Sequence, residues 1–142
     1  MPFSPYLNFR GNCREAFEAY RDLLGGELSI MSMADAPSDY EVPEDQRDLV
    51  MHAYLVTAQG DELMASDAPP DESGPVQGMY VHFSLPDAAE AERVFNGLSD
   101  GGQVEMPLSP TFWAEAFGVC VDRFGTPWMI SGPSTDSDGP VD

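Results

Sequence analysis

The sequence predicts an α+β fold made of two βαβββ modules, and two observations carry this prediction. The first is a repeated hairpin: residues 52–66 and 117–131 share one layout, in which Gly60 corresponds to Gly125 and Met64 to Met129 at a constant offset of 65 residues. The second is that a strand pattern and an amphipathic helix pattern precede each hairpin. A repeated hairpin with the same preceding elements indicates a duplicated module.

The first module begins with alternating residues 5–10, followed by a helix that Asn12 is predicted to cap. Gly25-Gly26 ends this helix. The apolar residues of the helix share one face: Ala16, Phe17, Tyr20, Leu23 and Leu24. Three strands then follow, at 27–33, 49–58 and 62–66, with a loop over 34–48 that is rich in Pro, Asp and Glu and holds one short helical turn.

Residues 67–78, which contain two proline motifs, are predicted to link the modules. The second module then begins with a strand at 79–84, which matches the first strand at an offset of 74 and places Tyr80 on Tyr6 and His82 on Asn8. Asp87 with Glu90 predicts a capping box at the start of the second helix. The predicted apolar face of this helix is Ala91, Val94, Phe95 and Leu98, and Gly101-Gly102 ends it. Strands are predicted at 103–106 and 112–122, before the last strand of the hairpin.

Length and composition bound the domain organisation. The chain has 142 residues, of which 42% are hydrophobic, which suits one ordinary core. We therefore expect a single domain over residues 1–132, with modules at about 3–68 and 78–132. Residues 133–142, made mostly of Ser, Asp, Gly and Pro, are expected to form a disordered acidic tail.

The charge balance is strongly acidic. The formal net charge is −19, and all six basic residues are Arg. This argues against nucleic acid and anionic membranes as partners, because both need basic surface. A solvated acidic surface explains the charge, and attraction of a cationic ligand is the alternative. With no secretory pattern and no membrane span, we expect a cytoplasmic protein in which Cys13 and Cys120 stay reduced and buried.

Alternation assigns the faces of the predicted strands. One face is apolar and should lie under the helices: Leu7, Phe9, Leu63, Ala65, Val81, Phe83, Trp128 and Ile130. The opposite, concave face mixes hydroxyl, amide, thioether and aromatic groups, which suits a pocket for a small, partly apolar ligand. We expect one pocket lined from both modules. Its candidate ligand-binding residues are Tyr6, Asn8, Met64, Tyr80, Trp113, Glu115 and Met129. For Met64 and Met129, simple filling of the sheet interior is the alternative.

Several sequence strings resemble one known family. They are residues 6–17 (YLNFRGNCREAF), 63–67 (LMASD), 111–113 (TFW) and 122–130 (DRFGTPWMI). Together with the paired modules, they resemble the glyoxalase/bleomycin-resistance superfamily, also called vicinal oxygen chelate proteins, and its PhnB-like branch in particular. The resemblance implies that the modules form an incomplete barrel-like sheet with the helices outside, and that the protein is a homodimer. It does not fix an activity, because the superfamily includes lyases, isomerases, dioxygenases, thiol transferases and drug-sequestering proteins.

The resemblance also implies where a metal would bind. Carried onto this chain, the metal positions of the superfamily are Asn8, Met64, His82 and Met129. Only His82 is an ordinary ligand for a divalent catalytic metal, so we expect no metal and no cofactor. His82 remains the candidate catalytic residue, as a general base, with a pocket hydrogen bond as its alternative role. His52 with Asp67 would be a different metal pair only if strand ends bring them together.

Three functions therefore remain open. The first is metal-independent binding of a small molecule, which the concave face favours. The second is an enzyme of the superfamily, of the lyase, isomerase or dioxygenase type, with a displaced metal or with His82 as the base. The third is sequestration of a cationic compound, which the charge alone favours.

Overall fold

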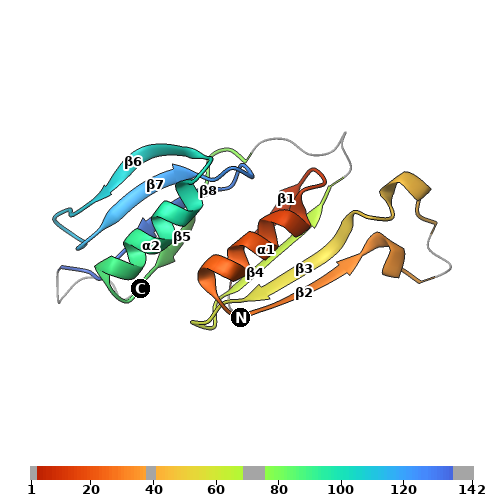
Figure 1. Ribbon diagram of the computed structural model, residues 1–142, viewed down its shortest axis with the longest axis horizontal. Helices are drawn as coiled ribbons and strands as arrows, with labels where there is room; N and C mark the ends of the chain where they lie inside the picture. Colours follow the sequence, from red (N-terminus) through yellow and green to blue (C-terminus); the bar gives the residue numbers. More distant parts are fainter. Residues whose placement is uncertain (1–2, 38–40, 69–75, 136–142) are drawn as a thin grey trace. The chain divides into compact units, whose positions relative to one another are not determined.

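A computed structural model of the chain describes residues 3–37, 41–68 and 76–135. The chain divides into two compact units, Met1–Gly74 and Pro75–Asp142. Each unit has one four-stranded sheet with one helix lying on it (Figure 1). The predicted α+β class and the two βαβββ modules are confirmed.

The N-terminal unit follows the predicted element order. Its helix and strands are β1 (Tyr6–Phe9), α1 (Cys13–Leu24), β2 (Glu27–Ser32), β3 (Val50–Val56) and β4 (Glu62–Asp67). Two short 3₁₀ turns, at Met33–Asp35 and Glu44–Gln46, lie in the loop where one helical turn was predicted. The sheet order is β1-β4-β3-β2, in which β1 runs parallel to β4 and the other neighbours are antiparallel.

The C-terminal unit repeats this arrangement. Its elements are β5 (Val81–Ser84), α2 (Ala88–Ser99), β6 (Gln103–Ser109), β7 (Phe117–Val121) and β8 (Pro127–Ser131). The sheet order is β5-β8-β7-β6, with β5 parallel to β8. A parallel pair needs a crossover connection, and in each unit the helix provides part of it.

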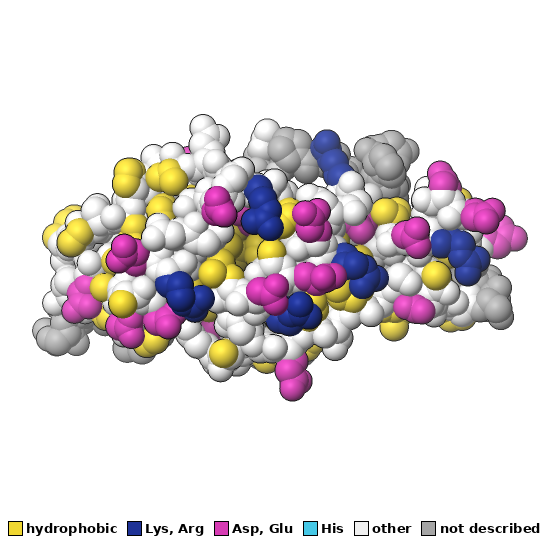
Figure 2. Space-filling view, in the orientation of Figure 1, with side chains coloured by type: hydrophobic (Ala, Val, Ile, Leu, Met, Phe, Trp, Pro, Cys, Tyr) yellow, Lys and Arg dark blue, Asp and Glu magenta, His cyan; other side chains and the backbone are white. Residues whose placement is uncertain are grey.

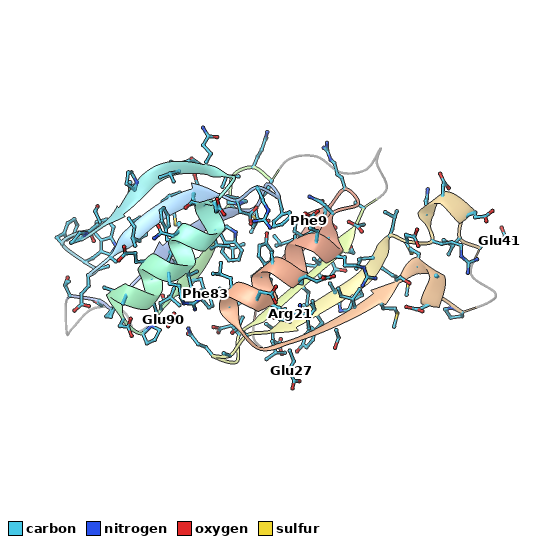
Figure 3. All side chains as sticks on the ribbon, in the orientation of Figure 1. Phe9, Arg21, Glu27, Glu41, Phe83 and Glu90 are labelled. Atoms are coloured by element: carbon cyan, nitrogen blue, oxygen red, sulfur yellow. The ribbon has the colours of Figure 1, made fainter. Side chains whose placement is uncertain are left out.

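Each sheet is buried on the side of its helix, as predicted. The eight residues predicted for the apolar faces are all buried. In the N-terminal unit, the ring of Phe9, labelled in Figure 3, packs edge-on against Phe17 of α1 with centroids 6.1 Å apart. We call the opposite side of each sheet its open face. Hence the open faces, and not the helix-covered ones, carry the predicted ligand-binding residues of the strands.

The outer surfaces of the helices are charged. Arg21 pairs with Asp22 on α1 at 3.2 Å, and Arg93 pairs with Glu90 on α2 at 2.8 Å. Figure 2 shows acidic and Arg side chains interspersed on the surface it presents. Interspersed charges of both signs are typical of a solvated surface. No helix among the described residues is long and apolar enough to cross a membrane.

Three predicted strand boundaries are wrong. The strand predicted at 103–106 extends to Ser109. The strand predicted at 112–122 begins only at Phe117, so Trp113 and Glu115 lie in the segment before β7. This segment is held instead by hydrogen bonds to the residues after β8: the N–H of Glu115 donates to the carbonyl of Pro133, and the N–H of Thr135 donates to that of Trp113. The strand predicted at 79–84 begins at Val81, after Tyr80. Most of the predicted tail, residues 136–142, lies outside the described residues.

The cap of α1 also differs from the prediction. The side chain of Asn12 does not cap the helix. Instead, buried Asp67 at the end of β4 accepts the N–H groups of Gly11 and Cys13 at 2.8 and 3.0 Å, and its other oxygen accepts the N–H of Val50 at 2.9 Å. One carboxylate thus joins the start of α1 to two strands. In α2, Asp87 caps the helix as predicted, by accepting the N–H of Glu90 at 2.7 Å.

A second buried carboxylate, Asp122, explains the structural role of residues 122–128. Asp122 accepts the N–H groups of Phe124 and Thr126 at 2.9 and 3.0 Å, and the indole N–H of Trp128 at 2.9 Å. Trp128 is among the largest fully buried side chains. This motif therefore closes the β7–β8 turn and fixes a core ring, which is a role in folding.

Candidate functional site

Three rows of side chains cross the open face of the N-terminal sheet, which we call the N-terminal face. Strand register defines the rows, because directly paired residues in neighbouring strands point to the same side. The rows are Glu27, Val56 and Glu62; Ser29, Tyr54, Met64 and Tyr6; and Met31 with His52, beside the pair Ser66 and Asn8. Carboxylates therefore lie at one end of this face, and rings lie at its centre.

Hydrogen bonds connect the rings and the carboxylate. The hydroxyl of Tyr54 donates to Oε1 of Glu62 at 2.6 Å, and the hydroxyl of Tyr6 lies 3.4 Å from Nδ1 of His52. The hydrogen bond to Glu62 raises the pKa of Tyr54 above its ordinary value, because ionised tyrosine could no longer donate to the carboxylate. Tyr54 therefore remains a donor at neutral pH.

The open face of the C-terminal sheet, the C-terminal face, is more apolar. Its rows are Gln103, Val121 and Pro127; Met106, Val119, Met129 and His82; and Ser109, Phe117, Ser131 and Ser84. Nε2 of His82 lies 2.8 Å from Oγ of buried Ser131, and Oγ of Ser84 lies 3.2 Å from the same atom. Ser131 is the orienting partner that the sequence did not reveal for His82. The exposed imidazole is thus held in place by a buried hydroxyl.

Trp113 lies beside the C-terminal face. Trp113 is 44% exposed, and the centroid of its ring lies 5.4 Å from that of Phe117 and 4.7 Å from that of Phe112. Phe117 is paired with Ser131 in the sheet. The structure therefore brings Trp113 near the row that contains Ser131, the hydrogen-bond partner of His82, although Trp113 is not in a strand.

The other predicted residues are placed less closely together. Tyr6, Asn8 and Met64 lie on the N-terminal face. Tyr80 and Glu115 are exposed residues outside the strands, and their part in ligand binding stays a prediction. So does a single pocket lined from both modules. Three rings of β3 and β7 that share these faces were not predicted to lie there: His52, Tyr54 and Phe117. The same alternation rule, applied to 50–56 and 117–121, places them on these faces.

The predicted correspondence between β1 and β5 is wrong by two residues. The hairpin offset of 65 is confirmed, because Tyr54 pairs with Met64 as Val119 pairs with Met129. Met64 pairs with Tyr6, however, and Met129 pairs with His82. His82 therefore corresponds to Tyr6 at an offset of 76, and not to Asn8 at 74. The face of every residue is unchanged, because a shift of two residues preserves the alternation.

Potential metal ligands are scattered. The described residues include no group of three or more His, Cys, Asp and Glu side chains placed to hold a metal ion. The alternative pair of His52 and Asp67 is wrong, because alternation places His52 on the N-terminal face and Asp67 on the helix side of the sheet. Asp67 is also occupied by three backbone N–H groups.

Both cysteines are buried free thiols. Burial, with a smaller contribution from the charge of Asp67, raises the pKa of Cys13 to about 12. Burial, and then the charge of Asp122, raises the pKa of Cys120 to about 11. Both thiols therefore stay protonated at neutral pH, which makes them poor nucleophiles.

Comparison with known proteins identifies the family. Residues 2–131 match the family described as 3-demethylubiquinone-9 3-methyltransferase. The chain belongs to this family. It is 35% identical to Protein YjdN of Escherichia coli over 92% of this chain and 95% of that protein. The family assignment rests on sequence and does not by itself show the activity in its description.

Solved structures share the fold of this chain. Protein PA1353 of Pseudomonas aeruginosa is 45% identical, with a TM-score of 0.84 over 93% of this chain and 97% of that one. A putative 3-demethylubiquinone-9 3-methyltransferase, PhnB protein, of Bacillus cereus is 25% identical, with a TM-score of 0.75 over 94% and 100%. In fold alone, the chain also resembles a glyoxalase/bleomycin resistance protein/dioxygenase of Alicyclobacillus acidocaldarius, at 16% identity and a TM-score of 0.55 over 96% and 92%. The predicted PhnB-like branch is confirmed, and the fold matches that of the predicted superfamily.

Proposed function

We propose that this protein binds a small, partly apolar molecule at the open faces of its sheets, without a catalytic divalent metal. The observation that carries the proposal is the C-terminal face, where the hydrogen-bonded group of His82, Ser131 and Ser84 lies beside Met129 and Phe117. Ligand sites in proteins are mostly apolar, with a few fixed polar groups that orient the ligand. The C-terminal face has this composition.

The side chains at the superfamily's metal positions support metal independence. Neither Asn8, which offers a weak neutral oxygen, nor Tyr6, which corresponds to His82, is an ordinary ligand for a divalent catalytic ion. The thioethers of Met64 and Met129 suit soft copper rather than such an ion. His82 is one strong ligand, whereas catalytic zinc sites typically use about three protein ligands. One imidazole cannot hold such an ion against water.

A ligand screen by thermal shift, with and without Zn²⁺, Mn²⁺ and Ni²⁺, tests this proposal. Ligands that bind the native state raise its apparent stability, and we expect equal shifts with metal and with chelator. Elemental analysis of protein purified without chelator should give well below one equivalent of metal per chain. A stoichiometric metal that disappears in His82→Ala would overturn metal independence.

The second candidate is an enzyme in which His82 acts as a general base. The 2.8 Å contact with Ser131 favours it, because a catalytic base needs a partner that fixes its ring. His82→Gln keeps a hydrogen-bonding side chain but removes the base. If this variant binds a ligand found in the screen but no longer turns it over, the enzyme is favoured. If the wild type leaves every bound ligand unchanged, simple binding is favoured.

The family description adds one compound to the screen. A methyltransferase would need a bound methyl donor, so S-adenosylmethionine belongs among the ligands tested. Stabilisation by this compound together with methylation of a phenolic acceptor would favour methyl transfer. Stabilisation by neutral planar compounds alone would favour the binding protein.

We further propose that the protein is a cytoplasmic homodimer that binds neither nucleic acid nor membranes. Family membership supports the dimer, and exposed edge strands such as β6 benefit from cover. The two free thiols support a reducing compartment, and the net charge of −19 opposes binding to polyanions. Light scattering at micromolar concentration should give twice the chain mass of 15.5 kDa, and a monomer mass would contradict the dimer.

A further inference from the structure

Three rings lie next to one another on the N-terminal face. The ring of His52 lies 5.9 Å from that of Tyr6 and 6.5 Å from that of Tyr54, measured between centroids, with interplanar angles of 32° and 23°. Tyr6 is 47% exposed, so this ring cluster is open to solvent. The faces of aromatic rings carry negative potential and attract cations that come within about 6 Å.

A carboxylate is fixed beside the ring cluster. Glu62 accepts the hydroxyl of Tyr54 at 2.6 Å and that of Ser4 at 3.2 Å, so each of its oxygens already has a donor. Glu27 lies in the same row, with Val56 between the two acids. Among the described residues, no Arg forms an ion pair with Glu27 or Glu62. Within the described residues, the negative charge at this end of the face is therefore not neutralised by an ion pair with Arg.

The C-terminal unit shows that this arrangement is not required by the fold. At the positions that correspond to Glu27, Tyr54 and Glu62, the register places Gln103, Val119 and Pro127. The duplicated sheet thus forms without the carboxylates and without the central ring. Packing of the unit does not explain their presence on the N-terminal face.

From these observations, we infer that the N-terminal face binds the alkylated ammonium group of a small cationic molecule. The inference rests on the proposed function and names the class of its ligand. Each oxygen of Glu62 already accepts one hydrogen bond, which leaves fewer acceptor sites for an ammonium N–H, while the charge and the ring faces stay available. A methylated ammonium group needs no hydrogen-bond acceptors and covers ring faces well, whereas a primary ammonium group would lose hydrogen bonds to water.

Two probes of the same shape test the charge requirement. Choline carries a trimethylammonium group, and 3,3-dimethyl-1-butanol has the same shape without the charge. Titration calorimetry at low ionic strength should give at least tenfold tighter binding for choline, and added salt should weaken only that binding. Equal affinity for the two probes, or no binding of choline at millimolar concentration, would refute the inference.

Matched variants locate the site. Glu62→Gln and Tyr54→Val should each weaken choline binding about tenfold. Glu18→Gln, on the exposed surface of α1, gives the same net charge as Glu62→Gln and should leave binding unchanged. Equal effects of the two Glu variants would show attraction by net charge alone and would overturn the site.

The outcomes also separate this inference from the proposed function. If neutral compounds from the screen bind and His82→Gln weakens them while choline does not bind, the cation site fails and the proposed function stands. If choline binds with the predicted variant pattern while no neutral compound binds, the cation site stands alone.

Discussion

Replacing Asp67 by Asn should destabilise the N-terminal unit, because it exchanges one carboxylate oxygen for an amide nitrogen. The Asn side chain keeps one carbonyl oxygen, which can still accept the N–H groups of Gly11 and Cys13. Its amide nitrogen would face the N–H of Val50, a buried donor that Asp67 now satisfies at 2.9 Å. A hydrogen bond to a charged group contributes roughly 1.5–3 kcal/mol, and an unsatisfied buried donor costs roughly 1–3 kcal/mol.

We therefore expect Asp67→Asn to lower the free energy of unfolding by about 2–3 kcal/mol. Asp67→Ala, which removes all three hydrogen bonds, should cost more, about 4–6 kcal/mol. Urea unfolding followed by circular dichroism measures both values, and an unchanged m-value would show that stability alone has changed. Asp61→Asn, which removes the same charge at an exposed position, is the control and should change stability by less than about 0.5 kcal/mol.

A second readout separates the carboxylate from general damage to the fold. The charge of Asp67 contributes to the raised pKa of Cys13. Asp67→Asn should therefore lower that pKa, which thiolate absorbance at alkaline pH measures, with Cys120 as the internal reference. If Asp67→Asn is as stable as Asp61→Asn and the pKa of Cys13 does not move, the assigned role of Asp67 is wrong.

Three further predictions concern close contacts, the Asp122 motif and alkaline pH. Gly26→Ala should lower the free energy of unfolding in urea by about 3 kcal/mol, because the φ of Gly26 is +105° and an added Cβ would overlap the carbonyl of Val56. Gly60 has a φ of +91° but open space around it, so Gly60→Ala should lower this free energy by only about 1 kcal/mol. Trp128→Phe should lower the free energy of unfolding by about 2–3 kcal/mol, because it removes the hydrogen bond to Asp122. Trp113→Phe, at an exposed residue, should leave this free energy nearly unchanged. Equal effects of the two variants would contradict the role of the Asp122 motif. Because the unfolded thiols ionise near pH 9 and the folded ones only near 11 to 12, the unfolded state loses protons first, so the free energy of unfolding should fall as pH rises from 9 to 11. A flat stability profile over that range, or an unchanged slope in Cys13→Ala, would contradict this.

Sequence alternation was sufficient to assign the sheet faces. Leu7 and Phe9 are buried and Tyr6 and Asn8 are exposed because β-strand side chains alternate with a strict period of two. The same period explains the main error. An offset of 74 and one of 76 give the same faces, so alternation cannot choose between them. The glycine pairs after the two helices distinguish the offsets of 74 and 76. Gly25-Gly26 and Gly101-Gly102 are 76 residues apart and take similar positions in the two units.

The hydrogen bonds that organise the candidate site could not be predicted from the chain. His82 and Ser131 are 49 residues apart in sequence, and their contact depends on the register of β5 against β8. Asp67 likewise was the first residue of the predicted linker, where nothing in the sequence showed that it accepts three N–H groups from two separate segments. Local patterns determine the strands and their faces, while such contacts depend on how the strands pair.

The offsets also locate the main place where the units differ in length. Corresponding residues are 76 apart at the starts of β2 and β6, which are Glu27 and Gln103, and 78 apart at Met31 and Ser109, because β6 contains two register shifts. They are 65 apart in the hairpins that follow. The drop in offset lies in the connection between β2 and β3, which is longer than that between β6 and β7. Chain can thus be added at this connection while the register on both sides is kept, because closing a longer loop costs little. For protein engineering, this connection is a natural permissive site, where an affinity tag or a second binding segment can be inserted without shifting either sheet.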